Sequence, residues 1–161
     1  MAKSWRRMGR LNGSDAGRMA KPLWVCANCR CFHDDRDPVT FKLVKPLACK
    51  FCKLSEMDYF PSTGEAQAWC ALHLRQRAGE IRNLRRQVPF DLVTVGEQGL
   101  TRVWAQAVLD FTFDEKSGGD WFAIRCDYKP AEGMSPDAAL KFRCLEAMGL
   151  PVRIITSKGE A

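Results

Sequence analysis

Apolar and polar positions along residues 62–157 follow a pattern that predicts helices and strands. Ser62 followed by Glu65 has the spacing of a capping box, which predicts a helix with Ser62 as its N-cap. Apolar side chains then recur at helical spacing, at Ala68, Trp69 and Leu72. We expect this helix to end near Gly79 or to continue to about Leu84, because Pro89 prevents a longer one.

Three β-rich segments follow, and they are Phe90–Val95, Arg102–Phe113 and Trp121–Tyr128. Gly118 and Gly119 lie between the last two segments and favour a hairpin turn at that point. The second and third of these strands are therefore expected to pair as a hairpin.

A second helix is bounded by clear start and stop signals. Ser135 is the predicted N-cap, Pro136 occupies the first helical position and Gly149 follows the end. Pro151 separates this helix from a last strand, Val152–Thr156. The predicted order is α-β-β-β-α-β, and the predicted fold class is α/β.

Composition and charge add a basic N-terminal tail to this picture. The chain is 46% apolar, enough for a core, yet it has no apolar run near the ~18 residues of a membrane span. We see no export signal and expect a soluble, cytoplasmic protein without a membrane partner. Much of the net charge of +6 comes from residues 1–21, which we expect to be disordered. Such a tail favours a polyanionic partner such as nucleic acid, or serves only as a solubilising arm.

Two C-x-x-C pairs mark residues 22–58 as a metal-binding module. Cys26 and Cys29 form the first pair, and Cys49 and Cys52 form the second. Two such turns complete a tetrahedral shell of four sulfurs, which suits one structural zinc ion per chain. The module resembles a zinc ribbon. Iron in a rubredoxin-like site and a redox dithiol pair are the alternatives.

The exact ligand set of this module stays open. Cys31 and His33 follow the first pair closely, and either could replace one of the four cysteines. Zinc ribbons bind nucleic acid, bind proteins or only stiffen a chain, and the sequence does not separate these roles.

Acidic and basic side chains in the second domain form a candidate active site. Side chains alternate along a strand, so Asp127 and Lys129 should project to the same face, and a hairpin should place Asp110 beside them. Close carboxylates are costly unless a cation neutralises them, and Mg²⁺ prefers such oxygens. A neighbouring lysine can orient or deprotonate a water, as metal-assisted phosphodiester hydrolysis requires. The alternatives are a turn residue at Asp110 and a solvated Asp127–Lys129 pair, with Glu65 as a capping partner only.

The order of these residues carries a resemblance to a known family. Glu65 lies in PSTGEAQAWCALHL, Asp110 in VLDFTF, and Asp127-Tyr128-Lys129 follows, with PDAALKFRCLEAMGLPVRII behind it. Residues 62–157 thereby resemble the PD-(D/E)-x-K nuclease superfamily, and more narrowly its small phage-encoded, Holliday-junction-resolvase-like members. The usual proline before the first aspartate is Leu109 here.

The resemblance implies a restriction-endonuclease-like core with a mixed sheet over residues 59–161. It implies catalysis by Glu65, Asp110, Asp127 and Lys129, with Mg²⁺ (or Mn²⁺) held by the three carboxylates. It also implies DNA as the substrate, branched DNA among the candidates, and a phage or prophage origin in a bacterial host cell. Cleavage of both strands of a junction would favour a homodimer.

Basic side chains fit a DNA ligand. Five arginines are expected to gather around the end of the first helix, and they are Arg75, Arg77, Arg82, Arg85 and Arg86. A solvated helix face is the alternative. The competing function is a non-catalytic DNA- or protein-binding adaptor that uses the ribbon as its binding surface.

Overall fold

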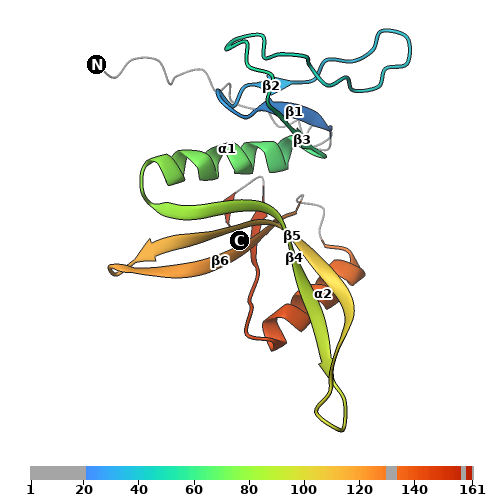
Figure 1. The fold of residues 1–161 in the computed structure, drawn as a ribbon, viewed down its shortest axis with the longest axis vertical. Coiled ribbons are helices and arrows are strands. Elements are labelled where there is room, and N and C mark those ends of the chain that lie inside the picture. The colour runs from blue at the N-terminus through green and yellow to red at the C-terminus, as the bar shows by residue number, and fades with distance from the viewer. Residues whose placement is uncertain (1–20, 130–133, 157–158, 161) are drawn as a thin grey trace. The chain divides into compact units, whose positions relative to one another are not determined.

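The computed structural model (Figure 1) describes residues 21–129, 134–156 and the backbone of residues 159–160. The chain forms two compact units, Met1–Thr63 and Gly64–Ala161. The predicted basic tail, residues 1–21, lies outside the described residues except for Lys21. The boundary between the units falls after Thr63, whereas the sequence suggests a boundary after residue 58.

The first unit contains a small antiparallel sheet. Its strands are β1 (Leu23–Cys26), β2 (Phe32–His33) and β3 (Met57–Phe60), in the order β2-β1-β3. Leu23, Val25 and Phe60 are buried and form most of its apolar interior. Three large apolar side chains make a small core, so this unit needs another source of stability.

The second unit is built on a five-stranded mixed sheet. Its elements are α1 (Thr63–Arg77), β4 (Ile81–Val95), β5 (Thr101–Ser117), β6 (Asp120–Tyr128), α2 (Pro136–Ala147), β7 (Arg153–Thr156) and β8 (Gly159–Glu160). The strand order is β4-β5-β6-β7-β8, with β6 and β7 parallel and the other pairs antiparallel. The predicted α/β class with a mixed sheet is confirmed.

The two helices pack on different stretches of the long β4–β5 hairpin. Trp69 of α1 stacks on Phe111 of β5, with 6.0 Å between ring centroids. Leu145 of α2 is fully buried in a cluster with Leu92, Ala107 and Leu109. Figure 1 shows the hairpin bending part-way along its length, with α1 over one part and α2 beside the other. The point where these stretches meet is the neighbourhood of Asp110.

The predicted end of α1 near Gly79 and the predicted start of α2 at Ser135 are confirmed. Gly79 has a φ of 76°, and its N–H donates to the Gln76 carbonyl. A glycine in the left-handed conformation is a common way for an α-helix to end. At α2 the Ala138 N–H donates to the Ser135 hydroxyl, and Pro136 follows the cap. The short polar and glycine signals in the sequence therefore locate these ends correctly.

The structure corrects the expected extent of the first strand. β4 begins at Ile81, so a helix that continues to Leu84 is wrong, and residues 81–89 are a strand. Pro89 lies inside β4 opposite Val108, where the open edge of the sheet tolerates a residue without an N–H. Asn83 and Gln87 have φ values of 56° and 50°, which are unusual for a strand. These interruptions hide the alternation that would have revealed the strand.

Candidate metal centre and acidic site

The first cysteine pair lies on a tight turn of the kind that holds metals. The Cys26 N–H donates to the Cys31 carbonyl at 3.0 Å, and the Arg30 N–H donates to the Cys26 carbonyl at 3.0 Å. Arg30, directly after Cys29, has a φ of 61°. The turn therefore folds the two thiols of the pair toward one point.

The second pair repeats the same backbone geometry. The Cys49 N–H donates to the Leu54 carbonyl at 2.8 Å, and the Lys53 N–H donates to the Cys49 carbonyl at 3.0 Å. Lys53 follows Cys52 with a φ of 64°, matching Arg30 in the first turn. By this repeat Cys31 corresponds to Leu54, so the backbone favours Cys26, Cys29, Cys49 and Cys52 as the primary ligands.

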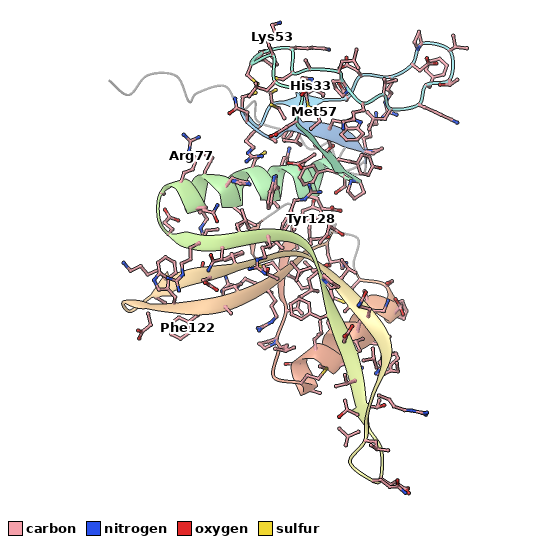
Figure 2. The ribbon with its side chains drawn as sticks, in the orientation of Figure 1. His33, Lys53, Met57, Arg77, Phe122 and Tyr128 are labelled. Carbon is pink, nitrogen blue, oxygen red and sulfur yellow. The ribbon has the colours of Figure 1, made fainter. Side chains whose placement is uncertain are left out.

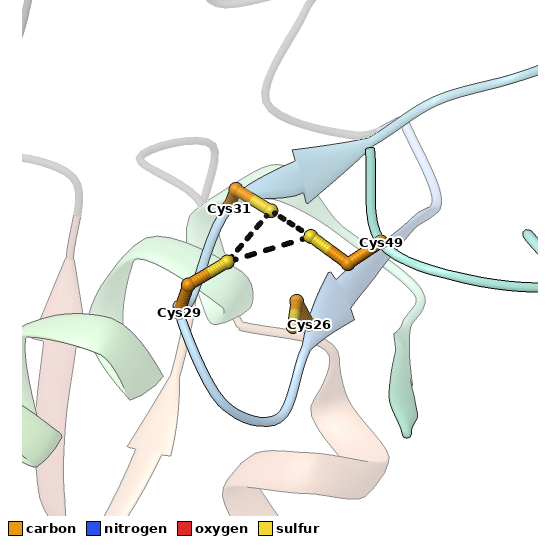
Figure 3. Close-up of side chains that lie close together, drawn as sticks. All are labelled: Cys26, Cys29, Cys31 and Cys49. Atoms are coloured by element: carbon orange, nitrogen blue, oxygen red, sulfur yellow. Dashed lines mark hydrogen bonds between the residues drawn. The ribbon is translucent and has the colours of Figure 1, made fainter. Parts of the chain in front are cut away.

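Sulfur atoms from both turns form one cluster. Four thiols lie within 4.8 Å of one another and could bind a metal such as zinc; they are Cys26, Cys29, Cys31 and Cys49 (Figure 3). The Cys52 Sγ lies 3.4 Å from the Cys26 Sγ. The structure thus brings three of the four predicted ligands into one group with Cys31, which the sequence left open, while the predicted ligand Cys52 lies outside that group and beside Cys26.

The surroundings of the Cys49 thiol favour its ionised form, which is the form that binds metals. Burial opposes its ionisation, but N–H groups of Cys52 and Phe51, at 3.4 Å and 3.3 Å from the sulfur, lower its pKa to about 5. Metals bind the thiolate, so a low pKa favours coordination at neutral pH.

His33 borders the same cluster. Its side chain is 1% exposed, and its Nε2 lies 3.2 Å from the Cys31 Sγ. Its Nδ1 lies 4.0 Å from an Asp35 carboxylate oxygen, and the Asp35 carboxylate in turn pairs with Lys50 at 2.5 Å. At 4.0 Å the Asp35 carboxylate makes no hydrogen bond to the ring, so the contact that the imidazole makes with the cluster is the one with Cys31.

In the second unit, three of the four predicted active-site residues lie together. The Asp110 carboxylate accepts the Tyr128 N–H at 2.8 Å, and it is one position along β5 from the Phe111–Cys126 pair. The Asp127 carboxylate forms an ion pair with Lys129 and interacts with the Asp110 backbone. Asp110 lies inside β5 and is not the end of a strand, because β5 continues to Ser117.

Asp127 is the most constrained charge in this site. It is 3% exposed. Burial and the Asp110 charge raise its pKa to about 6, while Lys129 opposes that rise. The Lys129 Nζ also lies 5.5 Å from the centre of the Phe142 ring of α2. A buried carboxylate that meets a second carboxylate and a lysine is typical of a functional site.

Glu65, the fourth predicted active-site residue, lies in the first turn of α1. A Cβ at Gly64 would overlap the hydroxyl and ring of Tyr128, so α1 begins against that side chain (Figure 2). Burial of Tyr128 raises its pKa, and the negative charge of Glu65 raises it further. Tyr128 points away from the face that carries Asp127 and Lys129. These contacts place Glu65 beside Tyr128, and its role with the carboxylate pair stays a prediction.

The arginines do not all gather at the end of α1. Arg75 and Arg77 lie in its last turn, but Arg82, Arg85 and Arg86 belong to β4. Arg75 donates to Glu80 and Glu115 at 3.1 Å and 2.5 Å. Arg82 pairs with Asp114 at 3.1 Å and lies 4.4 Å from the Trp121 ring centre. Ion pairs thus occupy Arg75 and Arg82, while the side chains of Arg77 and Arg85 are exposed.

Sequence reasoning misses one residue that supports the acidic site. The Gln87 side-chain amide donates to the Asp110 carboxylate at 3.0 Å. The sequence pattern leaves Gln87 between the first helix and the first strand, and no motif marks it. Only the pairing of β4 with β5 brings it opposite Asp110.

Comparison with known family models, curated proteins and solved structures finds no match to this chain. Neither described helix is long and apolar enough to cross a membrane. The cysteine cluster and the acidic site are therefore the features that bear on function.

Proposed function

We propose that the chain is a metal-dependent DNA endonuclease whose active site is formed by Asp110, Asp127 and Lys129. The observation that carries the proposal is the meeting of two carboxylates from neighbouring strands with a lysine on the same face of β6. The α-β-β-β-α-β order and the parallel β6–β7 pair also agree with the resemblance to PD-(D/E)-x-K nucleases.

The donor set fits a hard divalent cation. Asp110 and Asp127 supply carboxylate oxygens, the ligands that Mg²⁺ and Mn²⁺ prefer. The raised pKa of Asp127 reflects the cost of holding two negative charges in a buried place. A cation between them would remove that cost. Glu65 lies beside Tyr128, whose side chain points to the other face of β6, so we assign it no contact with this cation.

Each side chain then has a defined task. A bound Mg²⁺ would supply neutralising charge and lower the pKa of a water. Asp110 is fixed for this task by N–H donors from Tyr128 and Gln87. Lys129 would orient the attacking water and offset negative charge on the phosphate, because its ammonium lies directly beside Asp127.

The first unit would hold zinc and contribute to DNA binding. Its four primary cysteines fit a structural zinc ion, and the small core of the unit needs such support. Cleavage of both strands of a branched DNA would further require a homodimer with two such sites.

The test is a cleavage assay with supercoiled plasmid and four-way junctions, in Mg²⁺, Mn²⁺ or EDTA. We expect metal-dependent cleavage that falls about 100-fold or more in Asp127→Asn and in Lys129→Met. Asp120→Asn is the matched control, because Asp120 is exposed at the start of the same strand. Cleavage that survives in Asp127→Asn would refute the site.

A non-catalytic adaptor is the second candidate, and exposed side chains of the first unit favour it. Large apolar side chains there are more than 70% exposed, and they are Val39, Phe41, Leu47 and Phe51. Lysines lie among them in the sequence, at positions 42, 45, 50 and 53. Salt-sensitive DNA binding without cleavage of any substrate would favour this function.

A further inference from the structure

The cysteine cluster contains more donor atoms than one zinc ion can use. A structural zinc takes four ligands in a tetrahedron. The two turns supply Cys26, Cys29, Cys49 and Cys52, but the Cys31 thiol and the His33 imidazole lie in the same cluster. Both would be left as partly or fully buried polar groups beside a filled site, which is costly.

The six donor atoms fall into three pairs. Cys26 and Cys52 have their sulfurs 3.4 Å apart, and Cys29 and Cys49 have theirs 3.5 Å apart. The third pair is Cys31 with His33, whose Sγ and Nε2 are separated by 3.2 Å.

The Cys29–Cys49 pair lies between the other two. The Cys31 Sγ is 3.1 Å from the sulfurs of both Cys29 and Cys49, as the dashed lines of Figure 3 show. The Cys26 sulfur is within 4.8 Å of the same two atoms. The His33 and Cys52 side chains each interact with Cys49 as well. Cys29 and Cys49 therefore lie close to donors of both other pairs.

We infer that this cluster binds two zinc-class ions, which share the Cys29 and Cys49 thiolates as bridges. One ion takes Cys26 and Cys52 as its other ligands, and the second takes Cys31 and His33. The inference rests on the proposed metal site of the two cysteine turns and adds a second ion beside it.

The charges agree with a shared cluster, and the distances show what binding would change. Zinc–sulfur bonds of about 2.3 Å set sulfurs about 3.8 Å apart in a tetrahedron, so the pairs at 3.1–3.5 Å require a small expansion. The Cys26 and Cys31 sulfurs, which lie within 4.8 Å of each other, would move to about 6 Å apart to serve different ions. Five thiolates and a neutral imidazole around two dications leave one net negative charge. One dication with four thiolates leaves two net negative charges. The His33 Nε2 lies 3.2 Å from the Cys31 sulfur, so this ring nitrogen is the one available to the second ion.

The experiment is a count of metal ions on the reduced full-length chain. The protein is stripped of metal, reconstituted with excess Zn²⁺, and analysed by native mass spectrometry and elemental analysis. We expect two zinc ions per chain, and one in the double variant Cys31→Ser/His33→Ala. Cys144→Ser, which removes a thiol of α2, is the matched control and should retain two.

A second measurement needs no variant. The chain loaded with ¹¹³Cd²⁺ should give two cadmium NMR signals of equal intensity, one for four sulfurs and one for three sulfurs and a nitrogen. One ion per chain and a single signal would overturn the second site while leaving the first. No bound metal, with the native fold retained, would overturn the proposed zinc site itself.

Discussion

At the scale of single residues, the contact between Gly64 and Tyr128 fixes where α1 meets β6. A Cβ at Gly64 would collide with the tyrosine ring, so we expect Gly64→Ala to destabilise the chain by about 1–3 kcal/mol. Urea unfolding of Gly64→Ala, with and without Tyr128→Ala, checks this. The cost should largely vanish once the ring is absent, because alanine is otherwise the better helix residue. An equal cost in both backgrounds would contradict the contact.

Through Glu115, the stability of the second unit should depend on pH in the acidic range. Arg75 and then Arg153 lower its pKa, against the effect of burial. A lowered folded-state pKa contributes stability above the unfolded pKa of about 4.3, and that stability is lost as pH falls further. We expect the stability of the wild type to fall between about pH 5 and pH 3, and Glu115→Gln to flatten this loss.

The measurement for Glu115 is chemical unfolding across that pH range. Glu115→Gln should cost about 1 kcal/mol near pH 7, since the pair is partly exposed and screened. Glu80→Gln is the control, because Glu80 pairs with the same arginine on a more exposed surface. A wild type and a Glu115→Gln variant with parallel pH curves would rule out this role.

The residues of the acidic site could be named from the sequence because strand alternation and a hairpin turn are local signals. Asp127 and Lys129 share a face by their spacing alone, and the ion pair between them confirms it. The Gly64–Tyr128 contact and the bond from Gln87 to Asp110 join positions far apart in the chain. No local sequence pattern encodes such contacts, so they could be identified only from the three-dimensional structure.

At the scale of elements, β4 differs most from its prediction. Its alternation is interrupted by left-handed residues, and the positive net charge of its first half resembles an exposed helix end. The helix ends, in contrast, are predictable because Gly79 and the Ser135–Pro136 pair act within one turn. The extent of a strand depends on its partner, and β5 supplies the partner for all of β4.

Gln87, one of the two residues of β4 with a positive φ, gives a test at the scale of elements. Gln87→Val should destabilise the chain by about 1–3 kcal/mol, because a β-branched side chain is strained at a φ of 50°. Gln106→Val is the matched control on β5, where valine suits an exposed strand position. Thermal unfolding of both variants checks this, and equal shifts in Tm would argue against strain at Gln87.

At the scale of the whole molecule, the two units should respond differently to removal of metal. The first unit has a small core and a cysteine cluster, whereas the second has its own buried apolar clusters. We expect a strong zinc chelator to unfold residues 22–63 and to leave the second unit folded. Hydrogen exchange measured by mass spectrometry, before and after chelation, resolves the two. An equal fall in protection in both units would contradict their independence.

The DNA binding that we propose predicts a role for the exposed arginines of the second unit. We expect Arg77→Glu/Arg85→Glu to weaken binding and to reduce the slope of log affinity against log salt by about 2, one for each phosphate that the variant no longer neutralises. Arg102→Glu, on an exposed position at the start of β5, is the charge-reversal control at a single site. An unchanged slope would place the DNA-binding surface elsewhere on the chain.

From the parallel pairing of β6 with β7 we expect a particular order of folding. β4, β5 and β6 are joined by short turns, so their pairing closes small loops, whereas β7 pairs with β6 only after the α2 crossover. Asp110 and Asp127 therefore meet early, in the hairpin of β5 and β6. The Lys129 N–H donates to the Ile155 carbonyl of β7, so the backbone of the lysine is fixed only when the last strand docks. We therefore expect a chain released before β7 is complete to hold its two acids together while the backbone of Lys129 is still unfixed.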